Sequence, residues 1–224
     1  MTYWYGLPSP SLVQTDQLQI GDAESERAHH YLSPGSSDSY TVTSRYEWGV
    51  DTLNGKEVYP SDTDHGRTMR GTSEFKVHLR RDNIGVLLRR KLDYRFPNQR
   101  AEIYVTNHHG AKWRLAGIWY LAGSNTSIYS NPKEELGVTE HEVRTSNRRF
   151  RDDEFLISRV LTSGQKEIWV RVKFTPVNRP LFSGFPIAEQ AWSEIKYTAY
   201  CFVIPNMASL SRPAWPKLHA KAAN

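Results

Sequence analysis

Apolar and polar residues alternate over much of this chain, and the alternation is strongest in two stretches. Residues 85–105 read GVLLRRKLDYRFPNQRAEIYV, and residues 148–174 read RRFRDDEFLISRVLTSGQKEIWVRVKF. Successive side chains of a β-strand point to opposite faces of a sheet, so a period of two predicts strands with one buried face. The clearest predicted strand covers residues 166–174, with inward positions at Ile168, Val170, Val172 and Phe174.

The same alternation predicts further strands with turns between them. We expect these strands over residues 40–48, 73–79, 85–93, 100–105, 113–122, 140–145, 155–157 and 193–204. Helical periodicity is nearly absent, except for one short turn over residues 23–31, and residues 49–71 read as a long polar loop. About nine strands joined by turns are typical of an all-β protein, folded as an antiparallel β-sandwich or jelly roll.

These elements fit a single domain in a chain of 224 residues. We expect residues 40–204 to form the sandwich and residues 1–39 to wrap over one of its sheets. Residues 205–224 read as a loosely attached tail, because they are rich in small residues and contain proline.

Composition narrows the classes of partner. The chain carries 29 basic and 24 acidic residues, for a net charge of +5. Arginines mostly stand beside acidic residues, which indicates ion pairs on sheet faces rather than the concentrated basic surface of a nucleic-acid binder. The single cysteine, Cys201, lies in an apolar run and is expected to be a buried thiol.

The start of the chain has no basic segment followed by an apolar segment, so we expect a cytoplasmic protein without a secretion signal. No stretch approaches the roughly 20 apolar residues of a membrane-spanning helix, so no membrane partner is expected either. The histidine pairs 29–30 and 108–109 lack the spacing of metal ligands and are expected in solvent.

The two charged stretches predict a structural ion network. Arg90 falls on the apolar face of its strand, and a buried arginine needs a carboxylate partner, for which Glu102, Glu154 and Glu194 are candidates. The network that we expect to join two strands across the sandwich consists of Arg90, Arg149, Asp152, Asp153 and Glu154. Its acids offer an alternative, a Ca²⁺ site, because hard cations prefer several carboxylate oxygens; otherwise no cofactor or metal is expected.

Aromatic and charged side chains suggest a second kind of site. Sugar rings stack on indole faces while polar groups fix their orientation, although most aromatic residues of a sandwich pack in its core. Planar guanidinium groups can also clamp hydroxyls or carboxylates. The ligand-binding candidates are Trp48, Trp113, Trp119, Arg89, Asp93 and Arg100.

A glycosidase would need two carboxylates flanking the scissile bond. Glu47, Glu74 and Glu194 are the candidates, since they lie in or beside predicted strands that can be neighbours. With 24 acidic residues in the chain, such pairs arise easily, so the catalytic residues stay open.

Five segments, in order, resemble a known family: residues 65–75, 85–105, 117–125, 150–172 and 192–203. Their Arg89-Arg90, Gln99-Arg100-Ala101 and Asp152-Asp153-Glu154-Phe155 runs are similar to the C-terminal β-sandwich region of a bacterial family. That family includes difructose-dianhydride-forming α-fructofuranosidases and D-arabinofuranosidases. Its glycosidase module carries a Gly-Thr-Gly-Thr-Glu-Asp motif, which this chain lacks, so the resemblance implies the accessory region and not the chemistry.

Three classes of function follow. The first is a carbohydrate-associated domain that recognises a glycan, or another polar small molecule, or supports a glycan-active assembly. The second is a stand-alone enzyme with its own carboxylate pair, which would act as a glycosidase or modify a small molecule. Of these two classes, the sequence favours the one without catalysis. The third is a structural homo-oligomer, because exposed sheet edges pack readily.

Overall fold

The structure is a computed structural model with an all-β fold. It describes residues 9–34, 37–44, 52–53, 56–57, 62–94, 96–123, 127–130, 141–144, 150–177 and 190–204. Within these residues, no helix is long and apolar enough to cross a membrane.

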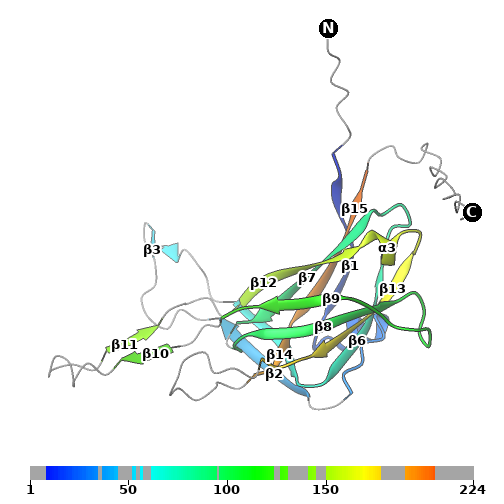
Figure 1. The fold of residues 1–224 in the computed structure, drawn as a ribbon. Helices are drawn as coiled ribbons and strands as arrows, with labels where there is room; N and C mark the ends of the chain where they lie inside the picture. The colour runs from blue at the N-terminus through cyan, green and yellow to red at the C-terminus, as the bar shows by residue number, and fades with distance from the viewer. Residues whose placement is uncertain are drawn as a thin grey trace, which may run out of the picture.

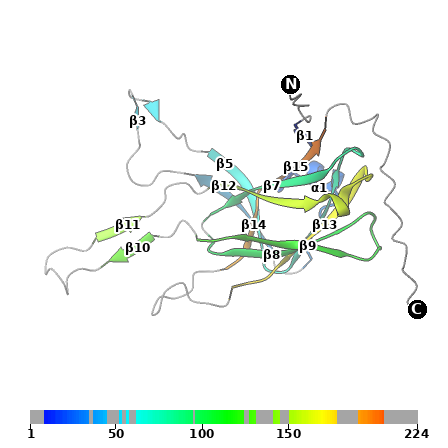
Figure 2. The same cartoon turned by 45° about the horizontal axis from the view of Figure 1, so that its top comes forward.

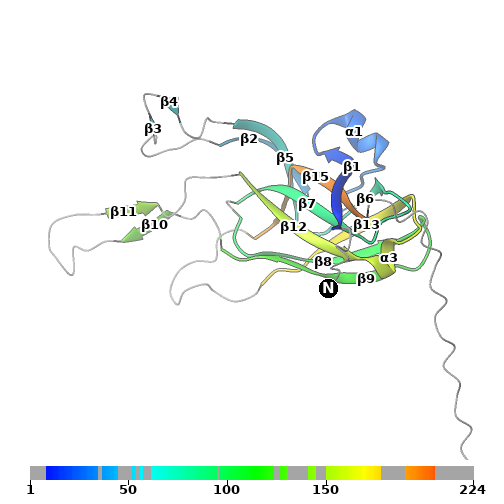
Figure 3. The same cartoon turned by 90° about the horizontal axis from the view of Figure 1, so that it is seen from above.

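Two four-stranded antiparallel sheets form the body of the sandwich. The first sheet has the order β1 (Ser11–Gln19), β15 (Lys196–Val203), β7 (Gly85–Asp93) and β12 (Phe150–Ser158). The second sheet has the order β6 (Thr72–His78), β13 (Glu167–Phe174), β8 (Gln99–Thr106) and β9 (Arg114–Leu121). Figures 1–3 show them as two stacked layers, with β7 and β12 above β8 and β9 in Figures 2 and 3.

Smaller elements complete the described part of the chain. A third sheet has the order β14 (Trp192–Glu194), β5 (Asp62–Met69) and β2 (Ser37–Ser44). Two antiparallel pairs join β3 (Thr52–Leu53) to β4 (Lys56–Glu57) and β10 (Ser127–Ser130) to β11 (His141–Arg144). The helical segments are α1 (Ala23–Ala28) and α3 (Arg159–Thr162).

The predicted inward faces form the core between the two sheets. Ile168, Val170 and Val172 of β13 are fully buried, and so is the predicted core thiol of Cys201. Burying a side chain of this size contributes about 1.5–3 kcal/mol, so the alternation read from the sequence is also the main stabilising pattern. The antiparallel β-sandwich is confirmed.

Two segments depart from the prediction. Ser11–Gln19 is a strand that pairs with β15, whereas the sequence suggested a segment lying over a sheet. A register shift between Gln14 and Asp16 breaks its period of two, which hid the strand. Asp62–Met69 is also a strand rather than part of a polar loop, because backbone pairing with β2 and β14 needs no apolar alternation.

Candidate functional site

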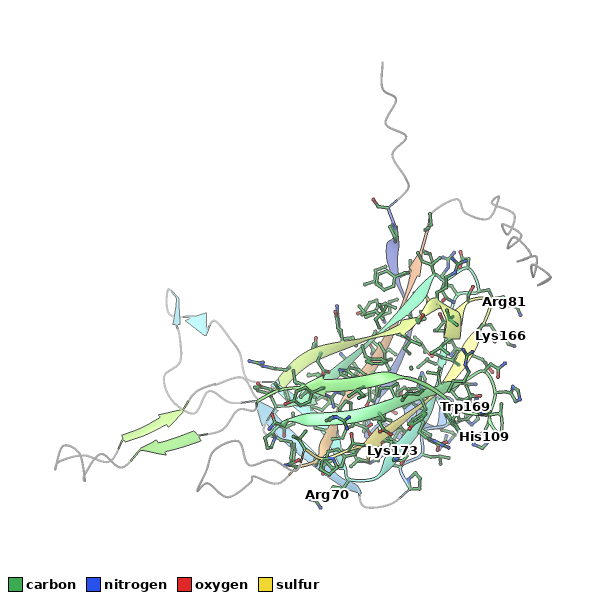
Figure 4. All side chains as sticks on the ribbon, in the orientation of Figure 1. Arg70, Arg81, His109, Lys166, Trp169 and Lys173 are labelled. Carbon is green, nitrogen blue, oxygen red and sulfur yellow. The ribbon has the colours of Figure 1, made fainter. Side chains whose placement is uncertain are left out.

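The outward surface of the second sheet carries the candidate site, and we call it the outer face. On β13 the outward side chains are Trp169, Arg171 and Lys173, which alternate with the buried valines and isoleucine of the core. Two open hollows lie on this face, one beside Trp169 and one beside Trp113. Figure 4 shows Trp169 and His109 close together, with Lys173 farther along the same strand.

The first, the Trp169 hollow, has a volume of about 680 Å³ and is lined by residues from three distant parts of the chain. The Trp169 ring is half-buried, and its centroid lies 5.5 Å from the ring of His30 and 4.8 Å from the ring of His109. The other lining residues are Ala23, Glu26, Arg27, Tyr31 and Leu32. An aromatic ring flanked by exposed polar rings suits a flat, polar ligand.

Helix α1 and the residues after it build one wall of this hollow. The Asp22 side chain caps α1 by accepting hydrogen bonds from the backbone N–H groups of Glu24 and Ser25. The chain then runs along the open edge of β6, where the Lys76 N–H donates to the His29 carbonyl at 2.8 Å. Leu32 and Glu74 exchange two backbone hydrogen bonds of 2.8 Å each. Residues 29–32 thus cover an edge strand and hold His30 beside Trp169.

An ion cluster fastens this wall to the sandwich. Asp16 of β1 accepts hydrogen bonds from His29 Nε2 at 3.0 Å, His78 Nδ1 at 2.9 Å and the His78 N–H at 2.7 Å. Burial raises the pKa of Asp16, but these hydrogen bonds outweigh burial and bring the pKa well below its usual range. The hydrogen bond to Asp16 raises the pKa of His29. His29 is therefore buried in an ion pair, contrary to the expectation that it lies in solvent.

The second hollow, the Trp113 hollow, has a volume of about 560 Å³ and lies farther along β13. The Arg171 guanidinium lies 4.0 Å from the centroid of the Trp113 ring. Glu74 accepts from Arg171 Nε at 2.7 Å, so the arginine is held over the ring by an ion pair. Tyr104 and Lys173 also line this hollow, which gives it one indole, one phenol and fixed charges.

The predicted ligand-binding residues divide between several places. Trp113 lies on the outer face, and Arg100 on the same sheet donates to Thr175 Oγ1 at 2.5 Å. Arg89 belongs to the first sheet, where it pairs with Glu154. Trp48 lies outside the described residues.

Two of these candidates, Trp119 and Asp93, are buried and are not presented on the surface. Trp119 is 3% exposed and stacks on Phe155 in the core, at 5.4 Å between ring centroids. Asp93 is fully buried at the end of β7, where its N–H donates to Ser193 Oγ and its carbonyl accepts from Gln99.

The predicted ion network is centred on Arg90, whose side chain is fully buried. Asp153 accepts from Arg90 Nε at 3.0 Å and from Nη2 at 2.8 Å. Arg90 Nη1 donates to Gln99 Oε1 and to the Ser193 carbonyl, and the guanidinium lies 3.4 Å from the centroid of the Trp192 ring. The partner is thus Asp153 and none of the three glutamates considered from the sequence.

The ion pairs of the network join neighbouring strands of one sheet, and the hydrogen bond from Arg90 to Gln99 of β8 connects them to the second sheet. Strands β7 and β12 pair antiparallel, with Arg90 opposite Asp153 and Arg89 opposite Glu154. Asp152 is exposed, and Arg149 lies outside the described residues. Two of the three adjacent acids are ion-paired, and no group of three metal-ligand side chains occurs in the described part of the chain.

The two carboxylate candidates that the structure describes, Glu74 and Glu194, do not form a pair. Glu74 points to the outer face, whereas the adjacent Ser73 points inward and donates to Glu194 Oε1 at 2.5 Å. Glu194 is fully buried and also accepts from Tyr31 at 2.6 Å and Tyr197 at 2.8 Å. Burial raises the pKa of Glu194, and the three hydroxyl donors offset part of that shift. Glu47 lies outside the described residues.

Sequence reasoning missed the Trp169 hollow. Trp169 was visible as an outward position of the clearest strand, and that position was the available signal. His30 and His109 reach it only through the course of residues 29–32 and of the turn between β8 and β9.

Comparisons with known proteins found only distant structural similarities. No protein-family model matches the sequence, and no curated protein matches it. A family 35 carbohydrate-binding module from Clostridium thermocellum is 9% identical, with 86% of this chain and 97% of that chain covered and a TM-score of 0.31. CsCBM6-3 from Clostridium stercorarium, solved with cellobiose, is 14% identical, with coverage of 84% and 92% and a TM-score of 0.33. The K1 cleaved adhesin domain of Lys-gingipain from Porphyromonas gingivalis W83 is 10% identical, with coverage of 87% and 95% and a TM-score of 0.32. Similarities this weak support no statement about a ligand.

Proposed function

We propose that this chain is a carbohydrate-binding domain whose ligand lies across the outer face. One observation carries the proposal: two indole rings, Trp169 and Trp113, stand in neighbouring open hollows of the same sheet face. Sugar rings stack on such rings, and the charged side chains beside them orient hydroxyl groups.

The spacing of the hollows favours an extended ligand over a single sugar. Trp169 lines the first hollow and Lys173 the second. Arg171, two residues before Lys173 on β13, lines the second hollow as well. Positions two and four residues along a β-strand lie about 7 and 13 Å away, so a ligand that fills both hollows is longer than a single sugar ring. Arg171 presents fixed donors, because Glu74 holds its guanidinium in place. An oligosaccharide lying along β13 would contact both rings.

A binding role is also favoured over catalysis. Glu74 is ion-paired with Arg171, and Glu194 is buried among hydroxyl donors on the other side of β6. A glycosidase needs two carboxylates near the same bond, which these two residues do not supply. The sequence resemblance to an accessory region of fructofuranosidase-like proteins, without their catalytic motif, supports the same choice.

Glycan-array screening followed by calorimetry tests the proposal. We expect Trp169→Ala and Trp113→Ala each to weaken oligosaccharide binding by about 30-fold, since truncating a central aromatic contact costs about 2 kcal/mol. The matched control is Tyr200→Ala, which removes an aromatic ring stacked under Arg89 on the first sheet, at 4.9 Å. Equal losses in all three variants, or turnover of the bound glycan, would contradict the proposal.

A further inference from the structure

The Trp169 hollow holds one arginine, Arg27, together with several hydrogen-bond donors. Arg27 lies in the last turn of α1, lines the hollow and is exposed. No carboxylate within the described residues forms an ion pair with Arg27. The nearby Glu26 is already engaged, because it accepts from Arg67 Nη1 at 3.0 Å and from the Gly21 N–H at 2.9 Å. Because Glu26 pairs with Arg67, the guanidinium of Arg27 stays available for a ligand.

Two histidines add further donors at the same place. His30 and His109 are both exposed, and each contacts the Trp169 ring with its own ring. A neutral imidazole has one N–H donor and a protonated imidazole has two. The hollow thus presents a stacking surface with a guanidinium and two imidazoles around it.

The Trp113 hollow differs in its charge. Arg171 is bound to Glu74, and Lys173 Nζ lies 3.6 Å from Glu102 Oε2. Its cations are balanced by acids on neighbouring strands. The two hollows therefore offer a ligand different charge environments on one face.

From this difference we infer that the Trp169 hollow selects an acidic sugar, a uronic acid unit, within the bound oligosaccharide. This inference rests on the proposed function. The sugar ring would stack on Trp169, and its carboxylate would accept hydrogen bonds from Arg27 and from an imidazole of His30 or His109. A carboxylate is planar and matches a guanidinium with two parallel hydrogen bonds. The charge-balanced Trp113 hollow would take a neutral unit of the same chain.

Calorimetry with matched oligosaccharides tests the selection. The probes are a tetra-galacturonate and the corresponding neutral galactose tetramer. We expect the unaltered protein to bind the acidic tetramer about tenfold more tightly, the usual contribution of one charge-assisted hydrogen bond. Raising the salt concentration should reduce this preference, because exposed charges are screened.

Variants assign the preference to the hollow. Arg27→Gln should lower affinity for the acidic tetramer and leave the neutral tetramer within about twofold. His109→Gln should lower affinity for the acidic tetramer more than for the neutral one, because it removes a donor beside Trp169. The matched control is Arg81→Gln, an exposed arginine that Figure 4 places away from Trp169. Trp169→Ala should weaken both tetramers.

The outcomes separate the two proposals. Equal binding of both tetramers, or no effect of Arg27→Gln on the acidic one, overturns the acidic-sugar inference and leaves carbohydrate binding standing. If the protein binds neither tetramer and no glycan of the array, carbohydrate binding is overturned as well. If a sulfated form of the neutral tetramer binds as tightly as the acidic tetramer, the hollow recognises any anion rather than a carboxylate. That result also overturns the inference.

Discussion

Removing the Asp153 carboxylate should destabilise the fold far more than it weakens ligand binding. Arg90 is fully buried and Asp153 is 10% exposed at its side chain. Asp153→Ala leaves a buried guanidinium without its counter-charge, which typically costs 3–5 kcal/mol. Arg90 keeps its hydrogen bonds to Gln99 and Ser193 and its contact with Trp192, so we expect about 3 kcal/mol.

The neighbouring ion pair offers a matched control. Arg89 and Glu154 pair one position along the same two strands, with Nη2 and Oε1 at 2.6 Å, but their side chains are 37% and 43% exposed. Exposed pairs contribute about 0–1 kcal/mol, so Glu154→Ala should cost far less than Asp153→Ala. The two variants differ mainly in the burial of the arginine that loses its partner.

Thermal and urea unfolding, followed by tryptophan fluorescence, measures both variants. At 2–4 °C per kcal/mol for a protein of this size, Asp153→Ala should lower Tm by roughly 6–12 °C. Replacing both partners, Arg90→Met with Asp153→Leu, should recover much of the loss, because no uncompensated charge stays buried. The structural role of the pair is refuted if Asp153→Ala lowers the free energy of unfolding no more than Glu154→Ala does. It is also refuted if Asp153→Ala weakens the free energy of ligand binding by more than it lowers the free energy of unfolding.

Two further predictions concern pH. Because the pKa of His29 is raised, the His29–Asp16 ion pair contributes fully to stability below pH 6.5. This contribution is lost as pH rises through the folded-state pKa of His29. Asp16→Asn should therefore cost about 2 kcal/mol at pH 6 and less at pH 9 in urea titrations, and an equal cost at both would contradict the ion pair. The raised pKa of Glu194 acts in the same direction, since the unfolded carboxyl loses its proton near pH 4.5 while the folded one retains it. Glu194→Gln should remove the part of the stability loss that occurs above pH 4.5, and a variant with an unchanged pH profile would show that Glu194 titrates normally.

Local periodicity was enough to predict the main strands and their buried faces. In β7, Val86, Leu88 and Leu92 share the buried face with Arg90, as the alternation indicates. The period of a strand depends only on the backbone, so it is readable from consecutive residues. The same reasoning placed Cys201 in the core and predicted a short helical turn where α1 lies.

Local patterns could not reveal which strands are neighbours or in what register. The partner of Arg90 is Asp153 because β12 pairs with β7 in one particular register, and that register depends on the packing of the whole sandwich. The burial of Trp119 likewise depends on Phe155 from another sheet.

The amino-acid sequence by itself determined an all-β sandwich with a buried arginine, because alternation and charge are properties of neighbouring residues. Only the tertiary structure brought together the residues of the proposed binding site. His30, His109 and Trp169 are far apart in the chain, and the order β6, β13, β8, β9 brings them around one hollow. Such a site requires long-range strand pairing, which sequence periodicity does not encode.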